Sequence, residues 1–335
     1  MASLDLISFA RALIDIDSTT GREHAAGEWL AAELSSMGYT VRRQDVAEGR
    51  FNVHAHLDEP QIVLSTHFDC VPPHFASDVR DGRLYGRGSC DAKGTLAAQV
   101  AAVERLRAAG ERRVGLLFVV GEERGSDGAM AANAVPSRTR FLINGEPTDS
   151  KLAIATRGIL RVKLLASGRA AHSAAPEQGE SAIEKLIDAL GRLKSLDLPS
   201  DPDLGRTFYT VGLIGGGNAP NVIPASAWAE VMFRTVGSAD DLLQLLRALE
   251  PLVRVEEVLR VRDVRLRTWP GFPAAVFPFT TDVPLLDRWG VPLLFGPGSF
   301  LVAHTAEECV PIAELEASVD TYARLARLCL QQTPA

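Results

Sequence analysis

Hydrophobic and polar residues follow one another along the first 157 residues in a way that predicts strands and helices in turn. Apolar residues recur at helical spacing before Gly38 and before Gly110, and Ser18 and Thr19 are candidates for the cap of the first helix. Strand-like runs predict strands at 41–46, 51–57, 61–66, 83–89, 115–120, 141–144 and 152–156. Strands that alternate with helices are typical of an α/β domain with a largely parallel sheet.

The pattern changes after residue 157. Over 158–266 the chain reads as a strand, a helix, two strands, a second helix and a last strand, which is the order of a ferredoxin-like split motif. From 267 the α/β pattern returns and ends in an amphipathic helix. We therefore predict an α/β domain with a mixed, largely parallel sheet flanked by helices (1–157 and 267–335) and an inserted α+β domain (158–266).

The composition narrows the classes of function. The 335 residues are 46% hydrophobic and carry a net charge of −7, which suits a soluble globular protein and disfavours general binding to nucleic acid or anionic membranes. No apolar run approaches the ~18 residues of a membrane span, and the acidic N-terminal stretch lacks the basic start of a secretion signal. Four cysteines without a C-x-x-C pair indicate reduced thiols, so we expect a cytoplasmic protein.

Two adjacent carboxylates, Glu122 and Glu123, directly follow the apolar run 115–120. At the end of a buried strand they repel each other and are costly to desolvate. Further imidazole and carboxylate groups follow other predicted strands or open a helix: His67, Asp69, Asp91, Glu146 and His304. Because sites in α/β sheets form beyond the carboxyl ends of the strands, we expect these side chains to lie close together.

Such a mixture of imidazole and carboxylate groups suits a zinc site, and also manganese or cobalt. A divalent cation would offset the repulsion between Glu122 and Glu123. One of the two could bind the ion, and the other could take a proton from water bound to it. Asp69 could orient the imidazole of His67. Taken singly, each carboxylate could instead lie in a surface loop, and Asp91 could simply cap a helix.

The chain also resembles the M20 family of metallopeptidases and N-acyl amino acid deacylases. This family includes acetylornithine deacetylase, succinyl-diaminopimelate desuccinylase, aminoacylase and the glutamate carboxypeptidases. The resemblance covers nearly the whole chain and rests on seven motifs in order: STHFDCVPP, YGRGSCDAKG, GEERGS, NGEP, RAAHSAAPEQGESAI, GGGNAPNVIP and GPGSFLVAHTAEE. One motif alone would be weak, whereas seven in order around the inserted split motif are specific.

The resemblance implies two divalent metal ions, zinc first, with cobalt or manganese as alternatives. It implies that Asp91 bridges both ions, that His67 and Glu146 complete one site, and that Glu123 and His304 complete the other. It also implies a cis peptide bond after Asp91.

Glu122 is then the general base, and Asp69 supports His67. The base would take a proton from the attacking water and pass it to the leaving amine.

The inserted domain resembles the lid and dimerisation domain of the family. By this resemblance His172 reaches the active site of the other protomer and binds the developing oxyanion. Asn221 and Arg234 match substrate-binding positions, and Gly298 lies in a segment that would offer backbone N–H groups. One departure affects Arg234: many members carry a carboxylate two residues earlier, where this chain has Met232.

The resemblance implies a dimeric di-zinc amidohydrolase that removes the acyl group from an N-acyl-L-amino acid. An activity like that of acetylornithine deacetylase, in amino-acid biosynthesis, is our first expectation. Alternatives are a deacylase for lysine or ornithine linked to an acidic carrier protein, an acetylcitrulline deacetylase, a succinyl-diaminopimelate desuccinylase, and a dipeptidase or carboxypeptidase. A non-catalytic scaffold on the same fold would be expected to lack ligands or the base, and all of them are present.

Overall fold

The computed structural model describes residues 4–332. The chain forms two compact units, which are described separately. The first comprises the chain up to Ile154, Leu266–Ala275 and the chain from Thr281; the second comprises Ala155–Arg265 and Val276–Thr280. The predicted boundaries differ from these units at a few residues: 155–157 and 276–280 were assigned to the first domain, and Leu266 to the inserted one. These residues lie in or next to β8 (Leu152–Thr156), β15 (Val264–Arg265) and β16 (Ala274–Phe277), which form a three-stranded sheet.

A six-stranded sheet with the order β1-β2-β6-β3-β7-β17 forms the framework of the first unit. Its strands are β1 (Thr40–Ala47), β2 (Arg50–His56), β3 (Ile62–His67), β6 (Val114–Val119), β7 (Phe141–Asn144) and β17 (Val291–Leu294). β3 is parallel to β6 and β7, and β17 is parallel to β7, whereas β1 and β2 join the sheet antiparallel. The predicted mixed sheet is confirmed. β3 and β6 are buried throughout; β6 is apolar along its whole length, whereas β3 ends in the polar residues Ser65, Thr66 and His67.

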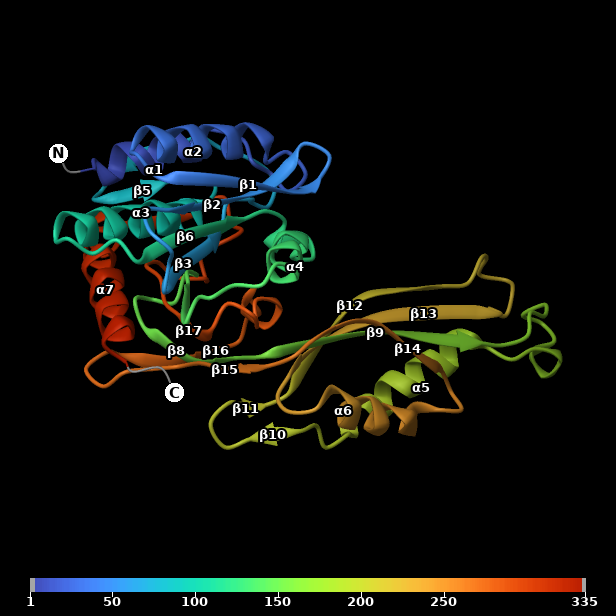
Figure 1. Ribbon diagram of the computed structural model, residues 1–335. Coiled ribbons are helices and arrows are strands. Elements are labelled where there is room, and N and C mark those ends of the chain that lie inside the picture. Colours follow the sequence, from blue (N-terminus) through green and yellow to red (C-terminus); the bar gives the residue numbers. More distant parts are fainter. Residues whose placement is uncertain (1–3, 333–335) are drawn as a thin grey trace. The chain divides into compact units, whose positions relative to one another are not determined.

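Helices cover both faces of this sheet (Figure 1). The larger core lies under α1 (Leu6–Ile14), α2 (His24–Ser36), α3 (Lys93–Ala108) and α7 (Ile312–Gln331), and the smaller core lies under α4 (Asp127–Ala134). The predicted cap of α2 at Ser18 or Thr19 was wrong, because α2 begins only at His24. The buried Ser18 hydroxyl donates instead to the carbonyl of Phe68, 2.5 Å away. A three-stranded sheet of β4 (Asp78–Arg80), β5 (Arg83–Tyr85) and β18 (Cys309–Pro311) completes this unit.

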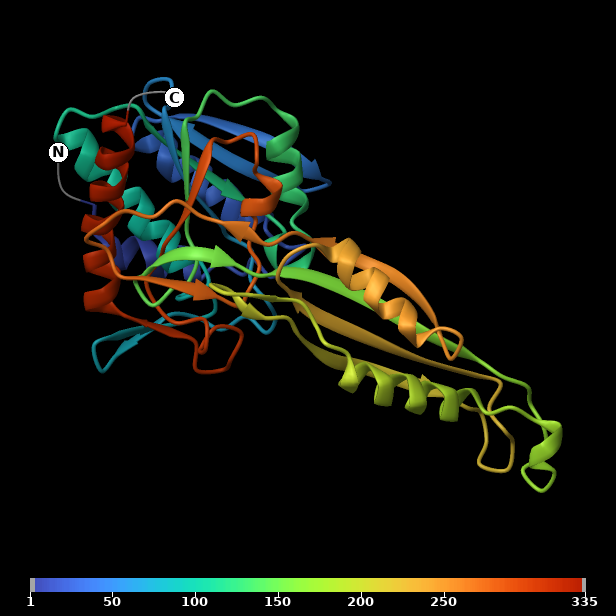
Figure 2. The ribbon, with the colours of Figure 1, turned by 90° about the horizontal axis from the view of Figure 1, so that it is seen from below.

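The second unit is an antiparallel sheet with the order β12-β13-β9-β14 (Figure 2). Its elements are β9 (Gly158–Ser167), α5 (Ala182–Ser195), β12 (Phe208–Gly216), β13 (Ser226–Thr235), α6 (Ala239–Leu246) and β14 (Arg254–Val261), with a small hairpin of β10 (Ser200–Asp201) and β11 (Gly205–Arg206). This is the β-α-β-β-α-β order of the split motif. Alternate residues of β9 and β13 are buried against α5 and α6. Ser181 and Ser238 cap these helices through their hydroxyl groups.

None of the helices within residues 4–332 is long and apolar enough to cross a membrane.

Candidate active site

Three neighbouring parallel strands bring polar residues to one edge of the first unit. His67 ends β3 and lies opposite Val119, the last residue of β6, while β7 lies on the other side of β3. Glu122 opens the short 3-10 helix η1 (Glu122–Arg124) just after β6, and Glu146 follows β7 by two residues. Parallel strands end at the same edge of a sheet, so the residues that follow them meet there.

The turn between β6 and η1 depends on a glycine. Gly121 has a φ of 76°, in the left-handed region that other residues rarely adopt. A Cβ atom at this position would also collide with the carboxylate of Asp127. The glycine therefore allows the chain to reverse directly after a buried strand and to present both glutamates at the sheet edge.

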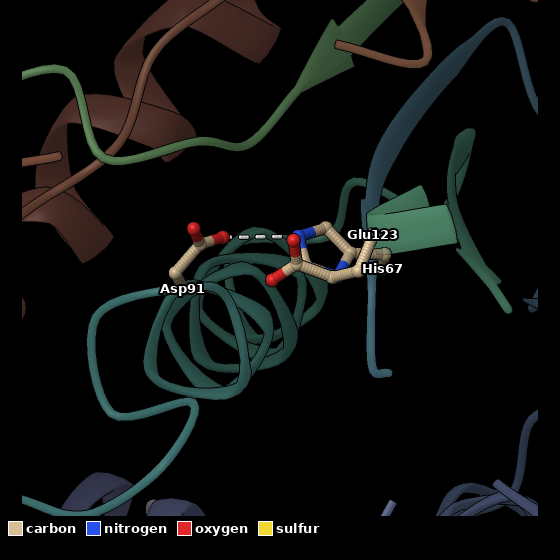
Figure 3. A group of neighbouring side chains, drawn as sticks. All are labelled: His67, Asp91 and Glu123. Carbon is tan, nitrogen blue, oxygen red and sulfur yellow. Dashed lines mark hydrogen bonds and ion pairs between the residues drawn. The ribbon is translucent and has the colours of Figure 1, made fainter. Parts of the chain in front are cut away.

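Asp91 lies in a cluster with four other side chains, those of His67, Glu123, Glu146 and His304. Figure 3 shows His67, Asp91 and Glu123. His67, Asp91 and Glu123 each offer a ligand atom, and these atoms lie within 4.8 Å of one another. His67 Nε2 lies 3.0 Å from one oxygen of Asp91 and 3.8 Å from a Glu146 oxygen. His304 Nε2 lies 3.3 Å from the other Asp91 oxygen and 3.0 Å from Glu123. The two oxygens of Asp91 thus face two different imidazoles, one in each half of the cluster.

The carboxylate of Asp69 faces His67 and also binds the backbone of Glu122 and Glu123. The Nδ1 atom of His67 lies 3.0 Å from the backbone carbonyl of Asp69 and 3.4 Å from its carboxylate. The fully buried carboxylate of Asp69 also accepts hydrogen bonds from the backbone N–H groups of Glu122 (3.0 Å) and Glu123 (3.2 Å), and from the hydroxyl of Thr20 (2.8 Å). An Nδ1–H that donates to Asp69 leaves Nε2 of His67 free to act as a ligand.

The electrostatics of the cluster favour a bound cation. Burial raises the pKa of Glu146 to about 8, and burial together with the neighbouring Glu146 raises the pKa of Glu122 well above its usual range. Burial opposes ionisation of Asp91, yet hydrogen bonds from His304 and His67 lower its pKa. One oxygen of Glu146 is buried without a hydrogen-bond partner among the described residues. Divalent metal ions fit a cluster of four carboxylates, one of which has this unpartnered oxygen, and two imidazoles.

Comparison with known proteins identifies the family. Residues 63–328 match the model of peptidase family M20/M25/M40. A probable carboxypeptidase of Aspergillus clavatus is 37% identical over 380 aligned residues, which cover 98% of this chain and 84% of that protein. The chain belongs to this peptidase family. It is therefore a metal-dependent hydrolase of amide bonds.

Solved structures share the fold. A tripeptidase from Staphylococcus aureus superposes with a TM-score of 0.81 at 20% identity, covering 98% of this chain and 99% of that one. A dinuclear metal-binding peptidase of the M20 family from Bacillus subtilis gives a TM-score of 0.74 at 15% identity, covering 98% of each chain.

Two buried carboxylates near the cluster were not predicted from the sequence. Asp282 is buried, and one of its oxygens has no hydrogen-bond partner among the described residues. Its charge contributes to the raised pKa of Glu122. Glu308, also buried, accepts a hydrogen bond from the backbone N–H of Asp91. Glu308 ends the motif GPGSFLVAHTAEE, whose histidine drew attention instead, whereas Asp282 lies outside the seven motifs.

The remaining predicted residue of the first unit, Gly298, packs against the segment that carries Asp91. Gly298 has a φ of 80°, and a Cβ atom there would come within 2.5 Å of the Cys90 sulfur. Its carbonyl accepts a hydrogen bond from the backbone of Asp149. A side chain at this position would therefore disturb the neighbourhood of Asp91.

The second unit separates the predicted substrate residues into two groups. His172 and Asn221 lie in adjoining loops, where the backbone N–H of Ser173 donates to the carbonyl of Asn221. Arg234 lies at the far end of β13, eight residues beyond Ser226, or roughly 26 Å along a strand at ~3.3 Å per residue. A single copy of this unit therefore cannot bring all three residues to one substrate.

Arg234 is a half-buried cation without a carboxylate within ion-pair distance among the described residues. Its guanidinium makes one long hydrogen bond, of 3.5 Å, to the hydroxyl of Thr280. Burial lowers its pKa, and no carboxylate opposes that effect. Charges withdrawn from water in proteins are usually paired, and the guanidinium of Arg234 lacks such a partner within its own unit.

Proposed function

We propose that this M20 hydrolase cleaves the amide bond next to a free carboxylate of its substrate. The unpaired guanidinium of Arg234 is the observation that carries the proposal. A planar guanidinium matches a carboxylate in two parallel hydrogen bonds and would fix the end of the substrate. Both an N-acyl amino acid and the C-terminal residue of a peptide offer such a carboxylate.

The ligand groups around Asp91 support a pair of metal ions, with zinc as the first choice and cobalt or manganese as alternatives. Glu123 and His304 would hold one ion, His67 and Glu146 the other, and Asp91 would bind both through its two oxygens. When bound, such ions supply Lewis-acid polarisation of the carbonyl group and increase the acidity of water.

Glu122 acts as the general base in this proposal. It takes a proton from the attacking water and delivers it to the leaving nitrogen. Asp69 fixes the backbone of Glu122 and Glu123, so the base and its neighbouring ligand keep a constant separation. A fixed base avoids the cost of reorienting a charged side chain during the reaction.

A second copy of the chain would supply His172, which would donate a hydrogen bond to the developing oxyanion, with Asn221 beside it. The separation of these residues from Arg234 within one unit supports this division. The edge strand β12 supports it too, because apolar side chains such as Leu213 and Ile214 are 55% and 61% exposed there. An exposed apolar edge strand is a ready surface for pairing with another chain. We therefore propose a homodimer through the second unit.

Two substrate classes compete within this proposal. N-acyl amino acids, with acetylornithine first, follow from the sequence motifs, and a carrier-linked lysine or ornithine is a variant of that class. Short peptides are favoured by the printed name of the Aspergillus relative, which is a probable carboxypeptidase. The two classes share the amide bond and the free carboxylate and differ in the acyl side.

Amine release from a panel of N-acyl amino acids, dipeptides and their carboxamides would test the proposal. We expect turnover of substrates with a free carboxylate, and little turnover of the carboxamides. Arg234→Gln should lower kcat/KM for the free acids by about 100-fold, the usual order for removing one partner of a buried charge pair. Arg192→Gln, an exposed arginine of the same unit, is the control. Equal turnover of acids and carboxamides by the unaltered enzyme would refute the proposed carboxylate recognition.

A further inference from the structure

Glu308 is a buried carboxylate whose two oxygens both accept hydrogen bonds. One oxygen accepts from three backbone N–H groups of a single segment, those of Gly88 (2.9 Å), Cys90 (3.2 Å) and Asp91 (3.0 Å). The other lies 2.6 Å from the guanidinium of Arg87. Glu308 has no measurable exposure, and four donors occupy it, so it is not itself available as a metal ligand.

Arg87 is buried, and other contacts besides the one with Glu308 fix its guanidinium. It is 2% exposed, it donates from Nε to the carbonyl of Pro73, and its guanidinium lies 5.0 Å from the ring centre of Phe75. The ion pair with Glu308 neutralises both charges within the core. Removing one partner would leave the other charge buried and unpaired, which is costly.

Glu308 connects the two segments that meet at the metal cluster. It lies four residues after His304, at the end of the loop that carries this imidazole, and its backbone carbonyl accepts from the N–H of Gly86. The next residue, Cys309, begins β18 and pairs with Tyr85 of β5. The side chain and the backbone of Glu308 thus both bind the 85–91 segment. This fixes the distance between His304 and Asp91, whose side chains lie 3.3 Å apart.

We propose that Glu308, paired with Arg87, is a positioning residue that sets the metal affinity of the cluster by holding Asp91 against His304. It acts through Asp91, the one side chain that faces both imidazoles. The effect is therefore on metal retention, and strongest for the ion held by Glu123 and His304. The proposal concerns the metal site alone and does not depend on which amide is cleaved.

Glu308→Gln is the informative variant. A glutamine oxygen can still accept from the backbone, but its amide group would face Arg87 as a second donor, and the negative charge would be lost. Glu307→Gln is a matched control, because the neighbouring Glu307 is 80% exposed and lies 3.8 Å from Arg80, its nearest cationic partner. Both variants remove one negative charge from adjacent positions.

The experiment measures metal content and competition with a chelator, for zinc and for cobalt, on the full-length protein. Glu308→Gln should bind one ion about 10–100-fold more weakly, the usual range for groups that orient a metal ligand. The second ion should change less, and Glu307→Gln should match the unaltered protein. In cobalt-loaded protein, the absorption bands of one site should be lost first. The kcat should fall at limiting metal and recover with excess metal, with KM little changed.

A purely structural role for Glu308 predicts a different result. The variant would then unfold at lower temperature with and without metal, yet it would bind both ions with unaltered affinity while folded. That outcome would overturn the proposal. If Glu308→Gln does not fold, Glu308→Asp keeps the charge and shortens the side chain, so that it cannot reach Arg87 and the backbone groups together. Unchanged metal affinity in a folded Glu308→Asp protein would overturn the proposal as well.

Discussion

Replacing Asp69 by asparagine should damage the active site more than it damages the fold. The carboxylate accepts from Glu122 N and Glu123 N, one on each oxygen, and from the hydroxyl of Thr20. Asparagine keeps one acceptor oxygen and presents an NH₂ group in place of the other. The hydroxyl of Thr20 can rotate and accept from this group, but the backbone N–H of Glu123 cannot.

The expected loss of stability and activity follows from the number of hydrogen bonds that are lost. One buried backbone donor loses its partner, which costs about 1–3 kcal/mol of folding free energy. The segment that carries Glu122 and Glu123 then loses half of its attachment, and His67 loses a negative charge 3.4 Å from its Nδ1 atom. Changes to a group that orients metal ligands typically cost 10–100-fold in affinity or activity. We therefore expect Asp69→Asn to lower kcat about 100-fold at saturating metal.

The assay is amide hydrolysis with zinc or cobalt in excess, together with thermal unfolding. Asp201→Asn is a matched control in the other unit, since Asp201 also accepts from two backbone N–H groups, those of Asp203 (2.8 Å) and Leu204 (2.9 Å). It should lose some stability and keep its kcat. If Asp69→Asn retained the kcat of the unaltered enzyme, the proposed attachment of Glu122 through Asp69 would be refuted.

The structure supports three further predictions. Burial raises the pKa of Glu146 to about 8, and hydrogen bonds to Asp91 and Glu123 raise that of His304 to about 10, so the folded protein holds these protons more tightly than the unfolded chain. The stability that these protons provide is therefore lost as the pH rises, starting at about 4.5 for Glu146 and at about 6.5 for His304. The melting temperature of the metal-free protein should fall between pH 5 and pH 9. A rise over that range would contradict the raised pKa values. Gly296→Ala should destabilise the protein by about 1–3 kcal/mol in denaturant unfolding, because its Cβ atom would collide with the backbone carbonyl of Glu146; an unchanged midpoint would count against that contact. A thiol reagent should label none of the four buried cysteines, Cys70, Cys90, Cys309 and Cys329, in the native protein and all of them after unfolding. Rapid labelling of the native protein would contradict their burial.

Those parts of the fold that depend on apolar periodicity could be predicted from the sequence. The continuous apolar run 115–120 predicted a buried strand, and β6 is buried along its whole length between β2 and β3. The start of α2 could not be predicted in the same way. A serine or threonine before an amphipathic stretch is the usual signal for a helix cap, but here Ser18 binds the carbonyl of Phe68, fifty residues away. Tertiary contacts of this kind leave no local pattern.

The same distinction explains which residues of the site were found. His67, Glu122 and Glu146 lie at or just beyond the ends of three neighbouring strands, so their positions after predicted strands indicated that they meet. Asp91 and His304 were expected at the same edge, but which ion each would bind followed only from the family resemblance.

The hydrogen-bond partners of Glu308 could not be predicted from the sequence. Three of its four partners are backbone N–H groups, and every residue except proline has one, so the amino-acid sequence does not reveal which segment such a carboxylate will bind. Its fourth partner, Arg87, lies 221 positions away in the chain. The pairing of β18 with β5 lies directly beside both residues, since Cys309 follows Glu308 and pairs with Tyr85. The arrangement of ligands at Asp91 therefore depends on a contact between segments far apart in the sequence, and we expect its loss to appear in metal binding before it appears in the fold.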